Sequence, residues 1–243
     1  MHSVRLVYLC ALAAGICALF LAAPGRAETI NFGSVSPFTG GDPGEGLDLT
    51  GSFAYAVNVD GPLVTPGNPF PTFTAGASTV GYSITGGSII NPWAPRPNYG
   101  PSSADDTLET LMQSVRWSGL YDDVSIALSV QQGTSYKLQL LFSEQSGGRN
   151  PGTRDFDIRI EGQMAVDGIS LNGTIVEPPT EGRVYTYEFT AQDSTLNIGL
   201  TRGQSSFDPS SIIQALTLET VPEPATLSLL ALGGLAIIRR RRK

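Results

Sequence analysis

The chain has 243 residues, of which 22 are acidic and 15 basic, and its formal net charge is −7. Its one histidine, His2, and its two cysteines, Cys10 and Cys17, all lie near the N-terminus. Beyond that segment the chain has no imidazole base, thiolate nucleophile or histidine metal ligand, so Ser-His-Asp catalysis, Cys-His catalysis and ordinary zinc sites are excluded there.

Residues 1–27 have the pattern of a secretory signal peptide. Arg5 precedes an apolar run from Leu6 to Ala23, and small residues at Gly25 and Ala27 stand where signal peptidase requires them. We predict cleavage after Ala27, within a helical signal segment. The alternative is an uncleaved N-terminal membrane anchor.

Residues 28–220 form the expected mature domain, which is long enough to bury a substantial core. This region holds eight cations and, because only Glu223 lies outside it, 21 acidic residues, which gives a formal charge of −13. Such a surface repels phosphate backbones, so we predict no nucleic-acid partner.

The first half of this region shows strand patterns separated by loops. Apolar residues alternate with small or polar ones over 53–59 and 80–84, which predicts two half-buried strands. The proline-rich stretch 91–101 is expected to run over the surface, because proline cannot pair inside a sheet. Residues 104–113 fit either one helical turn or a crossing between sheets.

The second half is more regular. Alternating apolar residues predict strands over 124–130, 136–142, 156–160, 185–189, 196–200 and 212–218. Many short strands separated by Gly, Asn and Asp turns favour an all-β, antiparallel, jelly-roll-like sandwich over any α/β arrangement.

Part of this pattern resembles the malectin-like, or more broadly galactose-binding-like, sandwich. The resemblance is carried by Gly133 to Glu144 (GTSYKLQLLFSE) and by Arg154 to Gly162 (RDFDIRIEG). It implies a jelly-roll domain over 28–220 whose loops at one end bind carbohydrate through aromatic and acidic residues. Asp208 is the best match to the acidic position, whereas Glu144 lacks the aromatic pair that follows it in binding members.

The aromatic residues expected in or beside irregular segments are Trp93, Tyr99, Trp117 and Tyr121. With Asp208 they are the predicted ligand-binding residues, because an aromatic ring can stack on a sugar face while a carboxylate bonds its hydroxyls. The alternative is that Trp93 and Tyr99 fold back to cover one open end of the sandwich, and that Trp117 belongs to the core.

The paired carboxylates do not predict a catalytic site. Glycoside hydrolysis needs two carboxyl groups across the bond, but the doublets Asp105-Asp106 and Asp122-Asp123 would point to opposite faces of a strand. Asp155 and Asp157 share a face and, with Arg159, suggest a solvated stripe. We assign no catalytic residue, metal ligand or cofactor; a structural Ca²⁺ is compatible with this composition, but no Asp-x-Asp-x-Asp-Gly-type loop occurs.

The C-terminal segment 221–243 has three parts. Val221-Pro222-Glu223-Pro224 precedes an apolar run, Ala225 to Ile238, and then Arg239, Arg240, Arg241, Arg242 and Lys243. As a helix the run is about 20 Å long, short of the ~30 Å hydrocarbon core, and the cations belong at the cytoplasmic face. We therefore predict a short transmembrane helix over 225–238.

This order of motif, apolar span and basic end resembles the PEP-CTERM sorting tail of bacterial exported proteins. It implies transient membrane anchoring, recognition by an exosortase and cleavage near Pro222–Pro224. We therefore predict an exported cell-surface or extracellular-matrix protein with a non-enzymatic sandwich and polysaccharide as its expected ligand. The alternatives are a structural matrix protein without a small ligand and a carboxylate-dependent glycosidase.

Overall fold

A computed structural model describes residues 30–38, 47–48, 51–65, 71–93, 97–119, 122–145, 154–170, 182–203 and 208–222. The predicted signal helix, the predicted transmembrane helix and Tyr121 lie outside these residues. Within them, no helix is long and apolar enough to cross a membrane.

The described residues form antiparallel sheets, as predicted from the sequence, and only the short β2–β3 pair is parallel. A six-stranded sheet has the order β1 (Asn31–Phe38), β11 (Gly182–Thr190), β8 (Ser135–Phe142), β14 (Ala215–Thr220), β2 (Ser52–Asn58) and β3 (Thr74–Ala75). A five-stranded sheet has the order β10 (Gln163–Ser170), β9 (Asp155–Ile160), β12 (Thr195–Arg202), β7 (Val124–Ser129) and β4 (Tyr82–Thr85). A small third sheet consists of β13 (Ile212–Ile213), β6 (Val115–Trp117) and β5 (Ser88–Ile90).

The main core lies between the two large sheets. Alternation along each strand sends every second side chain inward, so β8 contributes Tyr136, Leu138, Leu140 and Phe142, all buried. The Phe142 ring packs edge-on against Phe156 of the opposite sheet, with ring centroids 5.6 Å apart. The predicted inner faces of the second half of the chain are thus in contact.

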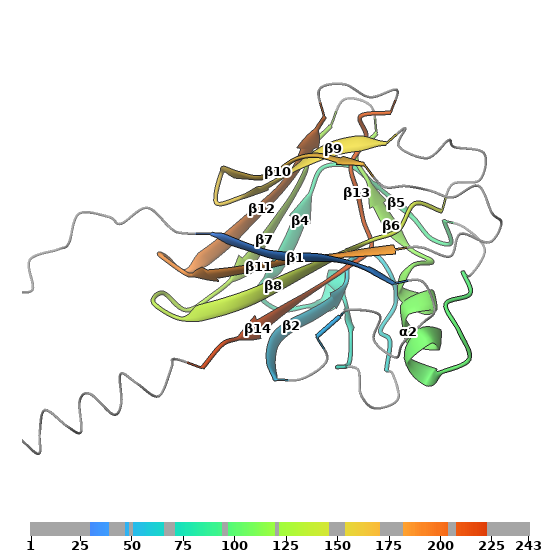
Figure 1. The fold of residues 1–243 in the computed structure, drawn as a ribbon, viewed down its shortest axis with the longest axis horizontal. Helices are drawn as coiled ribbons and strands as arrows, with labels where there is room; N and C mark the ends of the chain where they lie inside the picture. The colour runs from blue at the N-terminus through green and yellow to red at the C-terminus, as the bar shows by residue number, and fades with distance from the viewer. Residues whose placement is uncertain are drawn as a thin grey trace, which may run out of the picture.

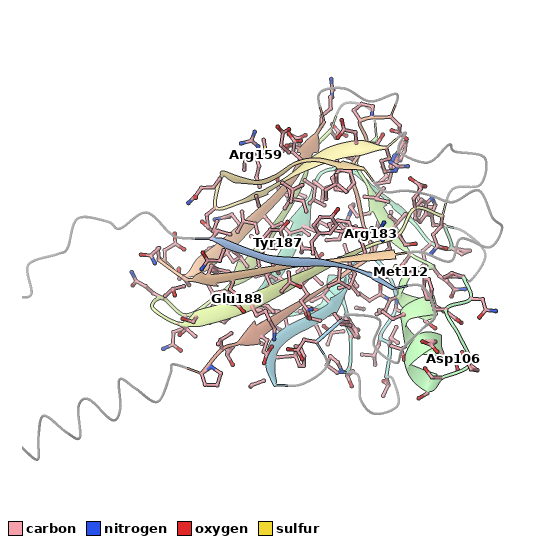
Figure 2. The ribbon with its side chains drawn as sticks, in the orientation of Figure 1. Asp106, Met112, Arg159, Arg183, Tyr187 and Glu188 are labelled. Atoms are coloured by element: carbon pink, nitrogen blue, oxygen red, sulfur yellow. The ribbon has the colours of Figure 1, made fainter. Side chains whose placement is uncertain are left out.

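A second core covers the outer face of the six-stranded sheet at one end. Leu141, Val184 and Ala215 are neighbours across three strands of this face and are fully buried. A helix, α2 (Ser103–Leu111), packs its apolar side into this cluster. Of the two structures expected for 104–113, the helical one is therefore correct, and the helix is longer than the single turn expected. Figure 2 shows Met112 where the helix meets the sheets, while Asp106 lies towards its other end.

Local sequence explains where α2 begins. The Ser102 hydroxyl accepts a hydrogen bond from the Asp105 backbone N–H (3.1 Å), and the Asp105 carboxylate accepts one from the Ser102 N–H (3.0 Å). This capping box satisfies two donors at the helix N-terminus, and two aspartates in the first turn favour the helix dipole. The doublet Asp105-Asp106 is therefore part of a helix start and not of a strand.

The sandwich has two distinct ends. The end formed by the turns 131–134 and 191–194, together with Ser52 and Thr220, is here named the tether end, because β14 finishes there beside Tyr136. The opposite end, named the α2 end, contains α2, the three-stranded sheet and the finish of β8. Figure 1 shows the start of β1 and the finish of β14 on the side away from α2.

Two sequence-based expectations were wrong. The stretch 91–101 does not run wholly over the surface, because Tyr99 is only 1% exposed and packs in the second core. Asp157 is not part of a solvated stripe: it is 3% exposed and accepts a hydrogen bond from the Gly168 N–H (2.9 Å). The reason is β10, an unpredicted strand that pairs with β9 through an irregular register and brings Gly168 onto Asp157.

We predict that the free energy of unfolding of the Tyr187→Phe variant will fall less at alkaline pH than that of the wild type. Burial, and next the neighbouring Tyr185, raises the pKa of the Tyr187 hydroxyl above its ordinary value. A raised folded-state pKa gives stability that is present below about pH 10 and is lost as the pH rises further, because the unfolded chain releases the proton first. Urea unfolding at pH 9 and pH 11.5 should show a smaller drop for the variant; equal drops would contradict the prediction.

Candidate functional site

A polar depression lies at the α2 end, where three segments meet. They are the turn after β2, the residue before the cis Asn91–Pro92 bond, and the C-terminal end of α2. The lining residues carry a carboxylate, two side-chain amides and two hydroxyls among them: Asp60, Gly61, Pro62, Asn91, Thr110, Gln113 and Ser114. Most of these groups can both donate and accept hydrogen bonds.

The floor of the depression is fixed by a buried asparagine. Asn58 donates its side-chain amide to the Pro62 carbonyl (3.0 Å) and accepts from the Ser114 hydroxyl (2.9 Å). Gly61 lies directly against these groups, since an added Cβ would come within 2.1 Å of the Asn58 amide and 2.4 Å of the Ser114 Oγ. A side chain at this position would therefore have to displace Asn58 and Ser114.

One wall is an ion pair between Asp60 and Arg116. The Arg116 Nη2 donates to Asp60 Oδ1 (3.0 Å), and its Nε lies 2.8 Å from Oδ2 as an ion-pair contact without a second hydrogen bond. The side chains are 5% and 13% exposed. Burial raises the pKa of the Asp60 carboxyl, and the Arg116 charge and hydrogen bond oppose that shift.

The other wall is the C-terminal end of α2, where backbone carbonyls carry partial negative charge. The helix is capped at Met112, and the Gln113 carbonyl accepts the Trp93 backbone N–H (2.7 Å). Trp93 is half-buried and packs against the main core. This hydrogen bond holds the segment containing Asn91 against the helix end.

A buried charged network supports the same end of the sandwich. Arg154, 2% exposed, forms a close ion pair with Glu144, and its Nη2 lies 3.4 Å from the Asp208 carboxylate. Its Nη1 also donates to the Ser210 carbonyl (2.8 Å). One guanidinium thus ties together the segment after β8, the start of β9 and the segment before β13.

Further hydrogen bonds extend from this network towards α2. The Tyr99 hydroxyl lies 3.3 Å from the Ser143 Oγ, and the Tyr99 backbone N–H donates to Glu109 of α2 (2.9 Å). Gln214 bonds both the backbone N–H and the carbonyl of Ser143, at 3.1 and 2.6 Å. The helix, the proline-rich segment and the end of β8 are therefore linked by hydrogen bonds.

The structure places the predicted ligand residues as follows. The Trp93 backbone adjoins the depression through its bond to Gln113, but its side chain packs against the main core and is not among the lining residues. Tyr99 is buried, and Trp117 is half-buried in β6, opposite Ile212. Asp208 is 4% exposed and engaged with Arg154 and Ser210. Tyr99 and Asp208 both join the buried network, and Tyr121 is outside the described residues; a ligand-binding role for these residues stays a prediction.

Sequence reasoning missed the residues that line the depression. Asp60, Gly61 and Pro62 directly follow the predicted strand 53–59, where they are typical of a turn, and Gln113 ends the stretch 104–113, for which the sequence leaves two structures open. One feature of the sequence does bear on these residues. Arg116 is one of only eight cations in the predicted mature domain, and a carboxylate in a turn, such as Asp60, is the kind of partner it requires. Within the described residues, no group of three or more His, Cys, Asp or Glu side chains could hold a metal ion.

Comparison with known proteins agrees with this architecture. Residues 220–243 match the PEP-CTERM protein-sorting motif. No curated protein matches the sequence. The structure is similar to the ANXUR1 extracellular domain from Arabidopsis thaliana, with a TM-score of 0.56 and 14% identity over 70% of this chain and 49% of that one.

Two further solved structures are similar. One is described as plant peptide RALF23 in complex with FER and LLG2, with a TM-score of 0.54 and 16% identity over 70% of this chain and 49% of that one. The other is the beta-glucuronidase of Bacteroides Uniformis, with a TM-score of 0.51 and 18% identity over 69% of this chain and 18% of that one. The chain spans about half the length of the receptor ectodomains it matches.

The fold and the tail together define an exported, surface-directed β-sandwich protein. More particularly, the chain ends in a PEP-CTERM sorting motif, and its structural neighbours are malectin-like β-sandwich domains.

Arg154→Met is expected to lower the free energy of unfolding by about 3–5 kcal/mol, because it leaves Glu144 and Asp208 buried without their cation. Urea unfolding would measure the loss. Arg159→Met is the matched control, since Arg159 is half-buried on the five-stranded sheet and should cost less than about 1 kcal/mol. Equal losses would contradict this account of the network.

Gly61→Ala should cost about 1–3 kcal/mol, because the new methyl group overlaps Asn58 and Ser114. Gly199→Ala is the control: its Cβ would have Arg159 Cβ as nearest neighbour at 3.6 Å, so no loss is expected. Thermal unfolding of the two variants provides the comparison. A Gly61→Ala protein as stable as the wild type would show that the turn can open without penalty.

Proposed function

We propose that the sandwich is a non-catalytic carbohydrate-binding module of an exported protein, and that the polar depression is its binding site. The observation that carries the proposal is the gathering of Asp60, Asn91, Gln113 and Ser114 around one depression beside Trp93. These residues come from segments far apart in the sequence and are held in place by buried hydrogen bonds and an ion pair.

The chemistry of the lining suits sugar hydroxyls. Each hydroxyl is both a donor and an acceptor, and it is recognised by carboxylate oxygens, amides and backbone carbonyls in a fixed arrangement. Asp60 is held rigid by Arg116, and Gln113 sits at the acceptor-rich end of α2. A small number of such groups is enough to orient one sugar unit, and the Pro62 ring is the apolar surface among the lining residues.

The residues of the depression support a binding role more than a catalytic one. Asp60 is the one carboxylate among the described lining residues, and it is neutralised by Arg116. Glycoside hydrolysis by two carboxyl groups requires a second one across the bond. The similarity to a beta-glucuronidase extends over 18% of that chain and bears on the fold alone.

A structural matrix protein without a small ligand is the second candidate. It is favoured by the burial of Tyr99 in the second core and by the packing of Trp93 against the main core. In that case the aromatic residues serve the stability of the α2 end, and the depression has no occupant.

A glycan array followed by calorimetric titration tests the proposal. The wild-type mature domain should bind at least one polysaccharide, and Gln113→Ala combined with Thr110→Val should weaken that binding about 5- to 50-fold, as expected for two lost hydrogen bonds.

The matched control is Gln132→Ala, which makes the same change on an exposed turn at the tether end and should leave the affinity unchanged. No binding to any glycan would favour the structural alternative. Binding that both variants weaken equally would place the sugar elsewhere on the domain.

A further inference from the structure

We propose that the tether end is the membrane-facing surface of the domain while the sorting tail is in place, and that the α2 end is thereby directed away from the bilayer. The inference rests on the sorting motif at 220–243 and on the topology of the sandwich. It does not require that the depression bind a sugar.

The first step is the position of the exit point. β14 lies in the middle of the six-stranded sheet, between β8 and β2, and its last residue, Thr220, pairs with both Tyr136 and Ser52. One further backbone bond, from the Val221 N–H to the Ser135 carbonyl (2.9 Å), extends this pairing. The folded domain thus holds the chain up to the residue before Pro222.

The second step is the length of chain that remains. Only Pro222, Glu223 and Pro224 separate Val221 from the first residue of the apolar run, Ala225. The four Cα–Cα steps from Val221 to Ala225 span at most about 14 Å even when fully extended. An apolar run in the bilayer therefore keeps Ser135 and its neighbours close to the lipid headgroups.

The third step is the direction of the opposite end. β8 has eight residues and runs from the tether end to the α2 end, a distance of about 24 Å at the rise of an antiparallel strand. The start of β1 also lies at the tether end, because Asn31 pairs with Glu188 near the finish of β11. The start of β1 and the finish of β14 therefore both lie at the tether end (Figure 1).

Single-cysteine fluorescence quenching would test this orientation in the full chain with its tail retained. The native thiols are removed by Cys10→Ala and Cys17→Ala. A fluorophore is then placed at Gln132→Cys or Asp193→Cys on the tether end, or at Ser103→Cys or Asp106→Cys on the α2 end; all four positions are exposed. The proteins are reconstituted into phosphatidylcholine vesicles that contain a headgroup-linked nitroxide lipid.

We expect several-fold stronger quenching at the two tether-end positions than at the two α2-end positions. A twelve-residue Gly-Ser insertion after Pro222 adds a flexible spacer of about 18 Å and should reduce the tether-end quenching towards the α2-end level. Glycan binding measured on the same vesicles would report on the depression separately.

Equal quenching at both ends, stronger quenching at the α2 end, or a protein that does not float with the vesicles would overturn the proposal. Tether-end quenching that the insertion leaves unchanged would also overturn it, because the surface itself, and not the short connection, would then hold the domain on the membrane.

Discussion

The burial of the six-stranded sheet on both faces at the α2 end is the constraint on which the remaining structure depends. Along β8 the inner residues Leu140 and Phe142 enter the main core, while Leu141 between them points outward. An outward leucine in the middle of a sheet, next to Val184 and Ala215, leaves apolar surface that must be removed from water. α2 and Tyr99 cover it, and the position of the helix end then determines where Thr110, Gln113 and Ser114 stand.

Burying this end also encloses charge, and the structure accommodates it by pairing. An isolated guanidinium or carboxylate in a dry interior is costly, so Arg154 is surrounded by Glu144, Asp208 and the Ser210 carbonyl. The same principle applies at Asp60 and Arg116. These pairs join segments that no regular strand connects, and they give the end of the sandwich one defined arrangement of its irregular segments.

The two-sheet core could be predicted from the sequence because alternation is a local signal. The alternating residues of 124–130, 136–142 and 196–200 are the inward-facing residues of β7, β8 and β12. The adjacent leucines at 140 and 141 were a further signal, since two neighbouring apolar residues on a strand require burial of both faces.

The candidate site could not be predicted in the same way, because it is formed by contacts between residues far apart in the sequence. Asp60 and Arg116 are 56 residues apart, and Tyr99 and Ser143 are 44 residues apart. Whether an aromatic residue in a proline-rich stretch faces solvent or the core is decided by what covers the sheet beside it. Tyr99 faces the core because Leu141, on the outer face of β8, must be covered at this end, and the sequence of β8 does not indicate which distant segment covers it.

The division of the sandwich into two ends has a consequence for processing. The last hydrogen bond of the central strand pairing is made by the Val221 N–H, and the sequence expected to be cut begins at the next residue. Cleavage near Pro222–Pro224 therefore leaves the hydrogen bonds that pair β14 with its neighbours in place. Pro222 has no backbone N–H with which to extend the pairing, so Val221 makes the last of these bonds. The tail leaves the sandwich at the tether end, and the depression lies at the α2 end. Processing of the tail and any binding at the α2 end therefore involve different residues of the folded domain.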